Sequence, residues 1–434
     1  MKKYIIPFFL LIFFSQYAQD KMKDVLTLSE YLGYLKRYHP IVKQANLMIN
    51  NSEAKLLKAR GAFDPKIELD FNKKYFKESA YYTHLNGSFK VPTWYGIALK
   101  ANFEQNDGLF LNPENQGPVD GLYTAGISIS LARGMLTNKR MTTLKQAKFF
   151  VNQAKEEQQI LVNKILYNAS LSYFNWLKTY NEKRVFGSFL NNAKKRFKGT
   201  KRAYEEGAKP AIDTLEAGIT LNSRRLGLEK ASIQLVQSSL ELSNYLWLNE
   251  NTPIELKENI IPDLNTFDAI DSSFNIGLFH NENFDIEQHP KIKELGFKIK
   301  SLAANKRLKM NNLLPKMDFQ YNFISPKAKQ LNSFNTNNYK AGIHFSLPLF
   351  IRKERGDLAL AKIKLQDKKL ENNASKVVIQ NKITAIHKEL ASYISQNDFT
   401  FKIVRDYGVL LSAEERKFFL GESSLLLVNY REQQ

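Results

Sequence analysis

With 434 residues, the chain is long enough for two or three ordinary domains. Hydrophobic residues make up 43% of it, yet no stretch has the ~20 apolar residues of a membrane-spanning helix. The lack of cysteine excludes a disulfide framework and an anchor through a lipid-modified cysteine. The formal charge of +20 suggests acidic partners, anionic lipid or nucleic acid. Because the basic residues are spread along the whole chain, solvated helix faces are the preferred interpretation.

The start of the chain has the pattern of a secretory signal. Lys2 and Lys3 precede an apolar run over residues 5–14, and Ala18 supplies a small residue before a cleavage point. This pattern predicts a signal peptide over residues 1–18. A buried N-terminal strand is the alternative. Export argues against nucleic acid as a partner.

A short helix and then a longer one are expected next. Thr27, with glutamate three residues later, has the spacing of a capping box and predicts a helix start. Pro40 suits the first turn of a second helix, which Gly61 is expected to end.

A long-period repeat organises the chain. Residues 38–72 return as residues 288–322 without a gap, and His39 and His289 are each followed by proline. Such a repeat indicates two tandem copies of one unit.

The repeat sets the expected boundaries. The first copy covers residues 19–249, a linker that forms an equatorial region covers 250–287, and the second copy covers 288–434. By repeat symmetry the second copy stops within its returning helix, so we expect a truncation there.

Each copy contains two stretches in which apolar and polar residues alternate. They lie at residues 67–71 and 126–131 in the first copy, where the second is the expected partner of the first, and at 317–323 and 341–347 in the second. Alternation predicts strands with one apolar face. Four strands per chain are therefore expected. The long segment 73–124 could add a hairpin around residues 87–103.

Very long helices follow the strands. Residues 135–186 and 357–407 contain no glycine or proline, and the first run predicts a helix from Lys139 to about Glu206. Apolar residues recur at alternating spacings of three and four, which is coiled-coil patterning. The returning helix of the first copy has such a seam at Ile212, Leu215, Ile219, Leu226, Ile233, Val236, Leu240 and Trp247.

Together these stretches resemble the TolC-like outer-membrane efflux protein family, the outer membrane factors. The resemblance rests on LTLSEYLGYLKRYHP near the start, on the helix-to-strand junctions ARGAFDPKIEL and NNLLPKMDF, and on the glycine turns GAKPAIDTLEA and GESSLLLVNYR. Both copies carry the series in the same order. One departure is LAR at residues 131–133, where the second copy has LPLF.

The resemblance implies a mainly α fold with a small β part. In such proteins, three chains each give four strands to a twelve-stranded outer-membrane β-barrel, and long coiled-coil helices form a periplasmic α-barrel tunnel. The residues agree with this expectation, because four strands cannot close a barrel. The implied partners are two further copies, a periplasmic membrane-fusion adaptor, an inner-membrane pump of RND or ABC type, and outer-membrane lipid. The implied location is the outer membrane of a Gram-negative bacterium, with most of the chain in the periplasm.

No catalytic or metal-binding pattern is present in the sequence. The six histidines lack the HExxH spacing, and there is no phosphate-binding loop or nucleophile elbow. His39 and His289 stand beside helix-starting prolines, which favours a structural role. We therefore expect no enzyme, no metal and no cofactor.

The glycine turns are the candidate functional site. The resemblance implies that Gly207 and Gly421 mark the periplasmic tip, and that Asp213 and Glu216 could form an acidic constriction there. Alternatively, Asp213 is only a residue at the favourable start of a helix. The second copy has Leu427 and Tyr430 at the matching places. The basic residues Lys198, Lys201 and Arg202 could face an adaptor or merely water.

Two functions of different class agree with these features. The first is a passive exit duct for a tripartite efflux or type I secretion system. The second is an exported coiled-coil structural or adhesion protein without a pore. The alternating strands distinguish the two, because a coiled coil does not need them. The sequence identifies neither the cargo nor the pump.

Overall fold

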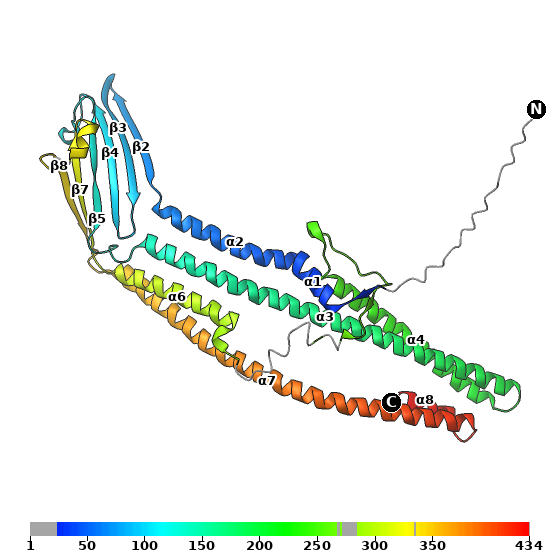
Figure 1. Cartoon of the computed structure of the whole chain (residues 1–434). Coiled ribbons are helices and arrows are strands. Elements are labelled where there is room, and N and C mark those ends of the chain that lie inside the picture. Colours follow the sequence, from blue (N-terminus) through cyan, green and yellow to red (C-terminus); the bar gives the residue numbers. More distant parts are fainter. Residues whose placement is uncertain (1–23, 267–269, 271–283, 334–335, 434) are drawn as a thin grey trace, which may run out of the picture. The chain divides into compact units, whose positions relative to one another are not determined.

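The computed structural model describes residues 24–266, 270, 284–333 and 336–433. The predicted signal peptide over residues 1–18 lies outside this part, as do residues 267–269 and 271–283 of the linker. The chain divides into two compact units (Figure 1). We call the unit of residues 43–164 and 283–401 the sheet unit, and that of residues 1–42, 165–282 and 402–434 the turn unit.

The sheet unit contains an antiparallel sheet of six strands among the described residues. Four strands per chain were expected, so that number is wrong. The expected direct pairing of residues 67–71 with residues 126–131 is wrong as well, because a hairpin over residues 79–107 lies between these two strands. The sequence had suggested a hairpin in this segment, around residues 87–103. In spatial order the strands are β2 (Lys66–Phe76), β3 (Ser79–Pro92), β4 (Ile97–Asp107), β5 (Leu122–Ser130), β7 (Lys316–Ser325) and β8 (Tyr339–Ser346).

Long helices enter and leave this sheet. Pro40 begins one helix and Gly61 follows its last residue, as the sequence predicts. Polar side chains join the helices within the unit: Gln158 donates to Asn46 at 2.5 Å, and Lys309 binds Asp357 at 2.6 Å. The helices are α2 (Pro40–Arg60), α3 (Lys139–Glu205), α6 (Pro290–Asn311) and α7 (Arg352–Phe419).

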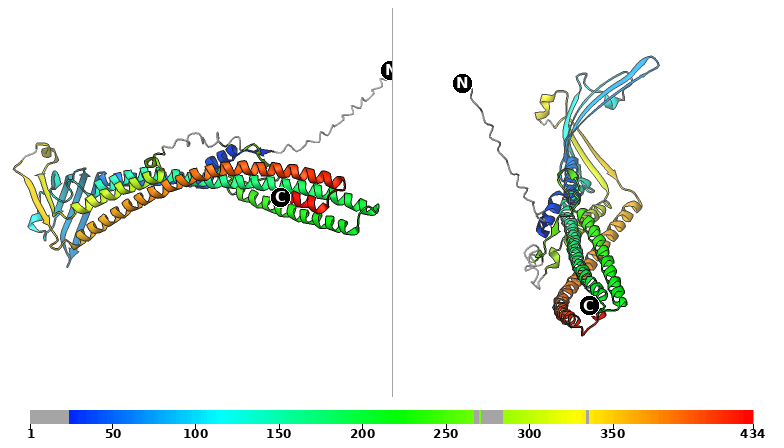
Figure 2. Two further views of the ribbon diagram at one scale, coloured as in Figure 1. Left: turned by 90° about the horizontal axis from the view of Figure 1, so that it is seen from below. Right: turned by 90° about the vertical axis from the view of Figure 1, so that its right-hand side faces the viewer.

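The turn unit combines the second part of α3 with α4 (Ala211–Ser243), which runs back beside it (Figure 2). The expected cap at Thr27 is confirmed, since its hydroxyl accepts from the Glu30 N–H at 3.2 Å. The further elements are α1 (Leu28–Tyr38), α8 (Leu425–Gln433) and a parallel pair of strands, β1 (Val25–Leu26) and β6 (Ile261–Pro262). Short 3-10 turns lie at Gly61–Phe63, Pro113–Asn115, Asn249–Asn251, Ile286–Gln288 and Ala328–Ser333.

An aromatic core holds the turn unit together. Tyr31 and Tyr173 are fully buried and their rings lie 5.8 Å apart. The Tyr173 hydroxyl donates to the Leu26 carbonyl at 2.8 Å, which fixes β1 to α3. Buried aromatic rings of this size contribute strongly to packing, and the hydrogen bond satisfies the polar end of the ring.

The two helices of the turn unit differ in which apolar face they bury. In α3, Ala169, Tyr173 and Trp176 follow the expected spacing of three and four residues, and all three are buried. The α4 seam is not, because Ile212 and Ile219 are 69% and 63% exposed. The opposite face of α4 packs inside the unit instead, with Ala217, Leu221, Arg224, Ala231, Ser238 and Leu242 buried.

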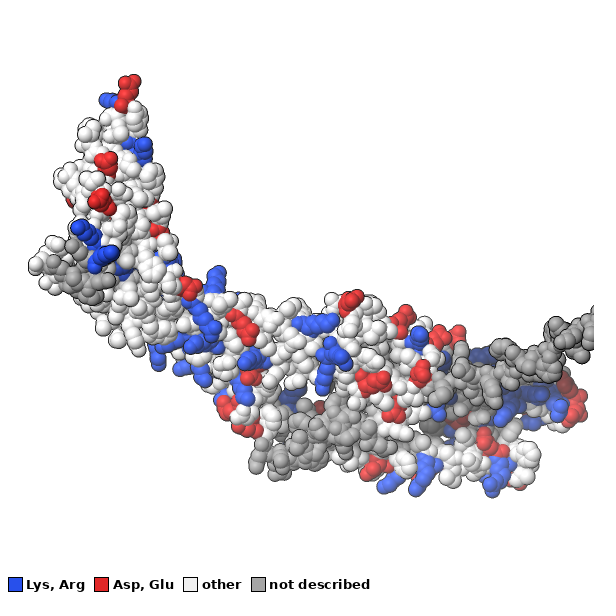
Figure 3. Space-filling view, turned by 45° about the horizontal axis from the view of Figure 1, so that its top comes forward, with Lys and Arg blue, Asp and Glu red and all other residues white. Residues whose placement is uncertain are grey.

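None of the described helices combines the length and apolarity needed to cross a membrane. Figure 3 shows charged side chains of both signs interspersed along the helices, with few on the visible part of the sheet. This distribution agrees with solvated helix faces rather than one basic patch on the surface in view.

Candidate functional site

Cross-strand pairing sorts the sheet residues onto two different faces. Directly paired residues share a face, and neighbours along a strand alternate. One row of pairs is apolar in all six strands: Ile67, Phe89, Ala101, Ala125, Phe323 and Tyr339. The adjacent row on the other face is polar apart from a glycine: Lys66, Lys90, Lys100, Gly126, Asn322 and Lys340.

The apolar face of the sheet is also exposed. Ile67, Leu69 and Ile343 show 81%, 71% and 70% of their surface. A contiguous apolar face of this kind is costly in water and indicates an apolar environment or a partner. Strands that alternate apolar-out and polar-in are typical of barrels in the outer membrane. The sheet therefore has the alternation of such barrel strands, with one apolar face and one polar face.

The glycine turns at the far ends of the long helices are built alike. Gly207 has a φ of 71° and Gly421 a φ of 81°, a region that glycine adopts without strain. Gly207 N–H donates to the Tyr204 carbonyl at 3.0 Å, and the next N–H donates to Ala203 at 2.8 Å. Gly421 and Glu422 make the same pair of bonds, at 3.1 and 2.9 Å, so both helices end in a Schellman motif.

The two predicted acidic residues lie at the start of α4. Asp213 is in its first turn, and its carboxylate lies 3.8 Å from the Lys209 ammonium group. The helix-start interpretation of Asp213 fits this position, because a negative charge there is favoured by the helix dipole. Glu216 is three residues further on, so both point from one side of the helix. One carboxylate oxygen of Glu216 is buried and has no hydrogen-bond partner among the described residues.

The three predicted docking residues lie on the last turns of α3. Lys198, Lys201 and Arg202 are all exposed. Lys201 is 3.9 Å from Glu205 one turn on, an exposed pair that adds little stability. The residues are therefore free to meet another surface, and their role in docking stays a prediction.

A buried ion-pair cluster beside the turns was missed by the sequence analysis. Arg196 Nη2 and Arg224 Nη2 lie 2.7 and 3.2 Å from the two carboxylate oxygens of Glu432, whose side chain is fully buried. Arg196 also contacts Asn429 at 3.1 Å and Glu415 at 3.2 Å. These bonds fasten α8 to α3 and α4. The partners are far apart in the sequence, so no local pattern could have found them.

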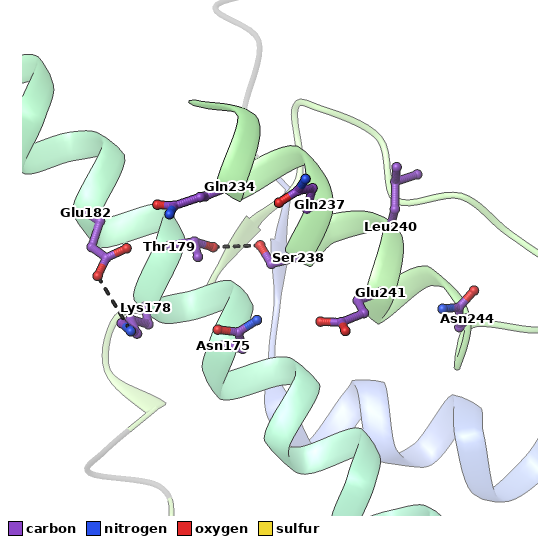
Figure 4. Close-up of a pocket in the computed structure, with 10 residues that line it drawn as sticks. All are labelled: Asn175, Lys178, Thr179, Glu182, Gln234, Gln237, Ser238, Leu240, Glu241 and Asn244. Atoms are coloured by element: carbon purple, nitrogen blue, oxygen red, sulfur yellow. Dashed lines mark hydrogen bonds and ion pairs between the residues drawn. The ribbon is translucent and has the colours of Figure 1, made fainter. Parts of the chain in front are cut away.

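A polar groove lies between α3 and α4 (Figure 4). Its volume is about 710 Å³. Thr179 and Ser238 meet across its floor with their hydroxyl oxygens 2.6 Å apart, and Lys178 pairs with Glu182 at 3.8 Å. The remaining lining is mostly amide and carboxylate: Asn175, Gln234, Gln237, Glu241 and Asn244, with Leu240. Such a groove offers hydrogen bonds to a partner.

The repeat-equivalent histidines have the structural role that was expected. His39 Nδ1 accepts from the Ile41 N–H at 3.1 Å, and His289 Nδ1 accepts from the Lys291 N–H at 3.1 Å. Burial lowers the pKa of both imidazoles below the usual value, because the charged form is desolvated. Both rings therefore act as neutral helix caps. Among the described residues, no group of histidine and acidic side chains could hold a metal ion.

Comparisons with solved structures identify the fold. The outer membrane channel CmeC of Campylobacter jejuni aligns with 94% of this chain and 79% of its own, at 14% identity and a TM-score of 0.62. CusC aligns over 94% and 85%, at 14% identity and a TM-score of 0.64. The outer membrane protein VceC of Vibrio cholerae aligns over 94% and 89%, at 12% identity and a TM-score of 0.61.

The expected resemblance to TolC-like outer membrane factors is therefore confirmed at the level of the fold. No family model matches the sequence. A search of curated proteins gave no match either. At identities this low, the structures speak for the fold, and the function has to be argued from this chain.

Proposed function

We propose that this protein is an outer-membrane channel, the exit duct of a tripartite efflux or type I secretion system. Three copies form the channel, with the sheets in the outer membrane and the long helices in the periplasm. The channel is passive and performs no chemistry. A periplasmic membrane-fusion adaptor and an inner-membrane pump of RND or ABC type deliver the cargo.

One observation carries this proposal: the sheet has an exposed apolar face and a polar face in all six strands. In lipid, a sheet must leave no unpaired edge, which requires closure with further strands. The likeness of the fold to solved outer-membrane channels supports the same function.

The second candidate, a coiled-coil structural or adhesion protein without a pore, is less well supported. Its helices need no sheet, and an apolar sheet face has no use in such a protein. The test is to purify the protein from the outer-membrane fraction and record from planar lipid bilayers. Heat-modifiable trimers that conduct ions support the channel. A soluble periplasmic monomer without conductance contradicts it.

The tip residues give a sharper test of the proposed tunnel. We propose that Asp213 and Glu216 of three copies surround the axis beyond Gly207 and Gly421. An acidic ring favours cations electrostatically. Asp213→Asn is expected to lower the cation preference, measured as the reversal potential in a salt gradient. Lys209→Gln, beside it, is the matched control and should change the preference in the opposite direction. An unchanged reversal potential in Asp213→Asn removes this residue from the ring.

A further inference from the structure

The hairpin of β3 and β4 enlarges the sheet beyond the strands that connect directly to the long helices. Its strands have 14 and 11 residues, and β2 has 11. About 9–11 residues suffice for a tilted strand to cross a bilayer. The ladders from β2 to β5 are continuous, apart from one shift at Lys74. The hairpin is therefore long enough to cross the membrane together with its neighbours.

The turn between β3 and β4, residues 93–96, is fixed to the segment that joins β5 to α3. Asn138 Nδ2 donates to the Trp94 carbonyl at 3.0 Å, and the Trp94 ring stacks on Phe63 at 5.5 Å. Gly96 has a φ of 68°, and a Cβ there would lie 2.6 Å from the Gly134 carbonyl oxygen. A side chain at this position would collide with the backbone, so the turn is fitted to its place.

The hairpin continues both faces of the sheet. Phe89, Val91 and Leu99 lie on the apolar side with Ile67, because each is paired with or alternates toward it. Its polar residues Ser88, Lys90, Lys100 and Asn102 lie on the other side. In water, the apolar side of the hairpin would be exposed, which is unfavourable. In the proposed membrane wall, lipid covers this side.

The strand directions allow copies to join at their edges. Each neighbour in the order β2 to β8 is antiparallel, so the two edge strands of a six-stranded sheet run in opposite directions. β2 of one copy can therefore pair antiparallel with β8 of the next. Both edge strands are exposed along their whole length. Six strands are fewer than the eight or more that form a membrane barrel.

We infer that three copies close an eighteen-stranded barrel, not a twelve-stranded one, with the β3–β4 hairpin as part of its wall. This rests on the proposed trimeric channel. Barrel diameter grows roughly linearly with strand number, so the backbone cross-section is about twice that of twelve strands. Barrels of 16–18 strands leave an aqueous channel. The membrane pore of this protein is therefore wide, and selection of cargo falls to its periplasmic end.

The first test asks whether the hairpin lies in the barrel wall. The chain has no cysteine, so a single introduced cysteine is the only thiol that a maleimide can label. Phe89→Cys and Ala101→Cys should resist a charged maleimide in the intact trimer, and a neutral fluorophore attached to either cysteine should be quenched by brominated lipid. Their neighbours Ser88→Cys and Asn102→Cys should show the reverse. Equal labelling of all four by the charged maleimide overturns the inference.

The second test uses cysteine pairs in the full-length trimer. β2 and β5 are separated by two strands, about 14 Å at ~4.8 Å per step, which is beyond the ~7 Å reach of a disulfide. Cysteines at Leu69 and Ile127 should therefore not cross-link within a chain. If they do, the hairpin lies outside a twelve-stranded barrel, and the channel proposal still stands.

Cysteines on the two edge strands test closure itself. A panel that combines Ile67, Leu69 or Phe71 of β2 with Ala341, Ile343 or Phe345 of β8 should give covalent rings of three chains. Covalent rings of two chains overturn the eighteen-stranded barrel. No cross-link from any pair contradicts the proposed channel as well, which separates the two failures.

Discussion

His39 and His289 show how single side chains hold this fold. Each ring nitrogen accepts the N–H two residues later and so begins a helix. Only the unprotonated nitrogen can accept, and burial lowers the pKa of both groups. Because the folded state binds these protons more weakly than the unfolded chain, the stabilisation is complete above the unfolded pKa of ~6.5. It is lost as the pH falls through the lowered folded pKa.

Replacing both caps by asparagine should therefore flatten the acid side of the stability profile. Asparagine caps a helix without titrating in this range. The His39→Asn, His289→Asn variant is expected to lose less stability between pH 7.5 and about 5 than the parent, as measured by denaturant unfolding. His387→Asn, at an exposed helix position, serves as the control and should follow the parent. Parallel profiles for parent and double variant contradict this account.

At the scale of elements, α8 is held by an ion-pair cluster in addition to the buried side chains of Leu425 and Val428. Its Glu432 carboxylate is fully buried between Arg196 and Arg224. Asn429 adds hydrogen bonds to Arg196 and to Thr220 on α4, at 3.1 and 3.2 Å. A buried charge that keeps all its partners is tolerated, whereas one that loses its partner is strongly destabilising.

Glu432→Ala should therefore detach α8. Removing the buried carboxylate that Arg196 and Arg224 share costs about 3–5 kcal/mol, although Arg196 keeps its contact with Glu415. Hydrogen exchange of residues 425–433 should rise, together with that of the facing turns of α3 and α4, while the sheet unit keeps its protection. Glu422→Ala removes an exposed carboxylate near the same turn and should leave exchange unchanged. Equal exchange in both variants would falsify the role given to the cluster.

At the scale of the whole molecule, the exposed seam of α4 indicates missing neighbours. Its predicted seam residues Ile212, Ile219 and Ile233 show 69%, 63% and 55% of their surface. Long helices gain most of their stability from packing an apolar face. The seam therefore fits a helix–helix contact with another copy, as the proposed tunnel of three chains would require.

Charges in this seam should prevent assembly while leaving the chain folded. Ile219→Glu combined with Ile233→Glu buries two carboxylates in the proposed contact, so the trimer should be lost. Light scattering in detergent gives the mass, and circular dichroism checks that helix content is kept. Ser223→Glu, at an exposed position beside the seam, should remain trimeric. A double variant that stays trimeric excludes this seam from the contact.

Much of the local structure could be predicted because its causes are local. Pro40 sets the start of α2, and Gly207 and Gly421 end α3 and α7 through their positive φ. The β3–β4 hairpin was harder to identify, because Thr83 and Gly87 interrupt the apolar alternation of β3. The polar row that contains Lys66 and Lys340 could not be identified from the sequence either. These two residues share a face only because four strands pair in order between them.

The sequence by itself determined the helices, most of the strands, the capping histidines and the glycine turns, because periodicity and capping act over a few residues. The tertiary structure alone decided the six-stranded order, the burial of Glu432 and the face of α4 that packs inside the chain. That face carries Ala217, Arg224 and Ala231, while the stronger apolar seam stays open. The physical reason is that strand pairs and ion pairs join residues far apart in the sequence. An apolar helix face can be covered either by the same chain or by another copy, and its pattern does not distinguish the two.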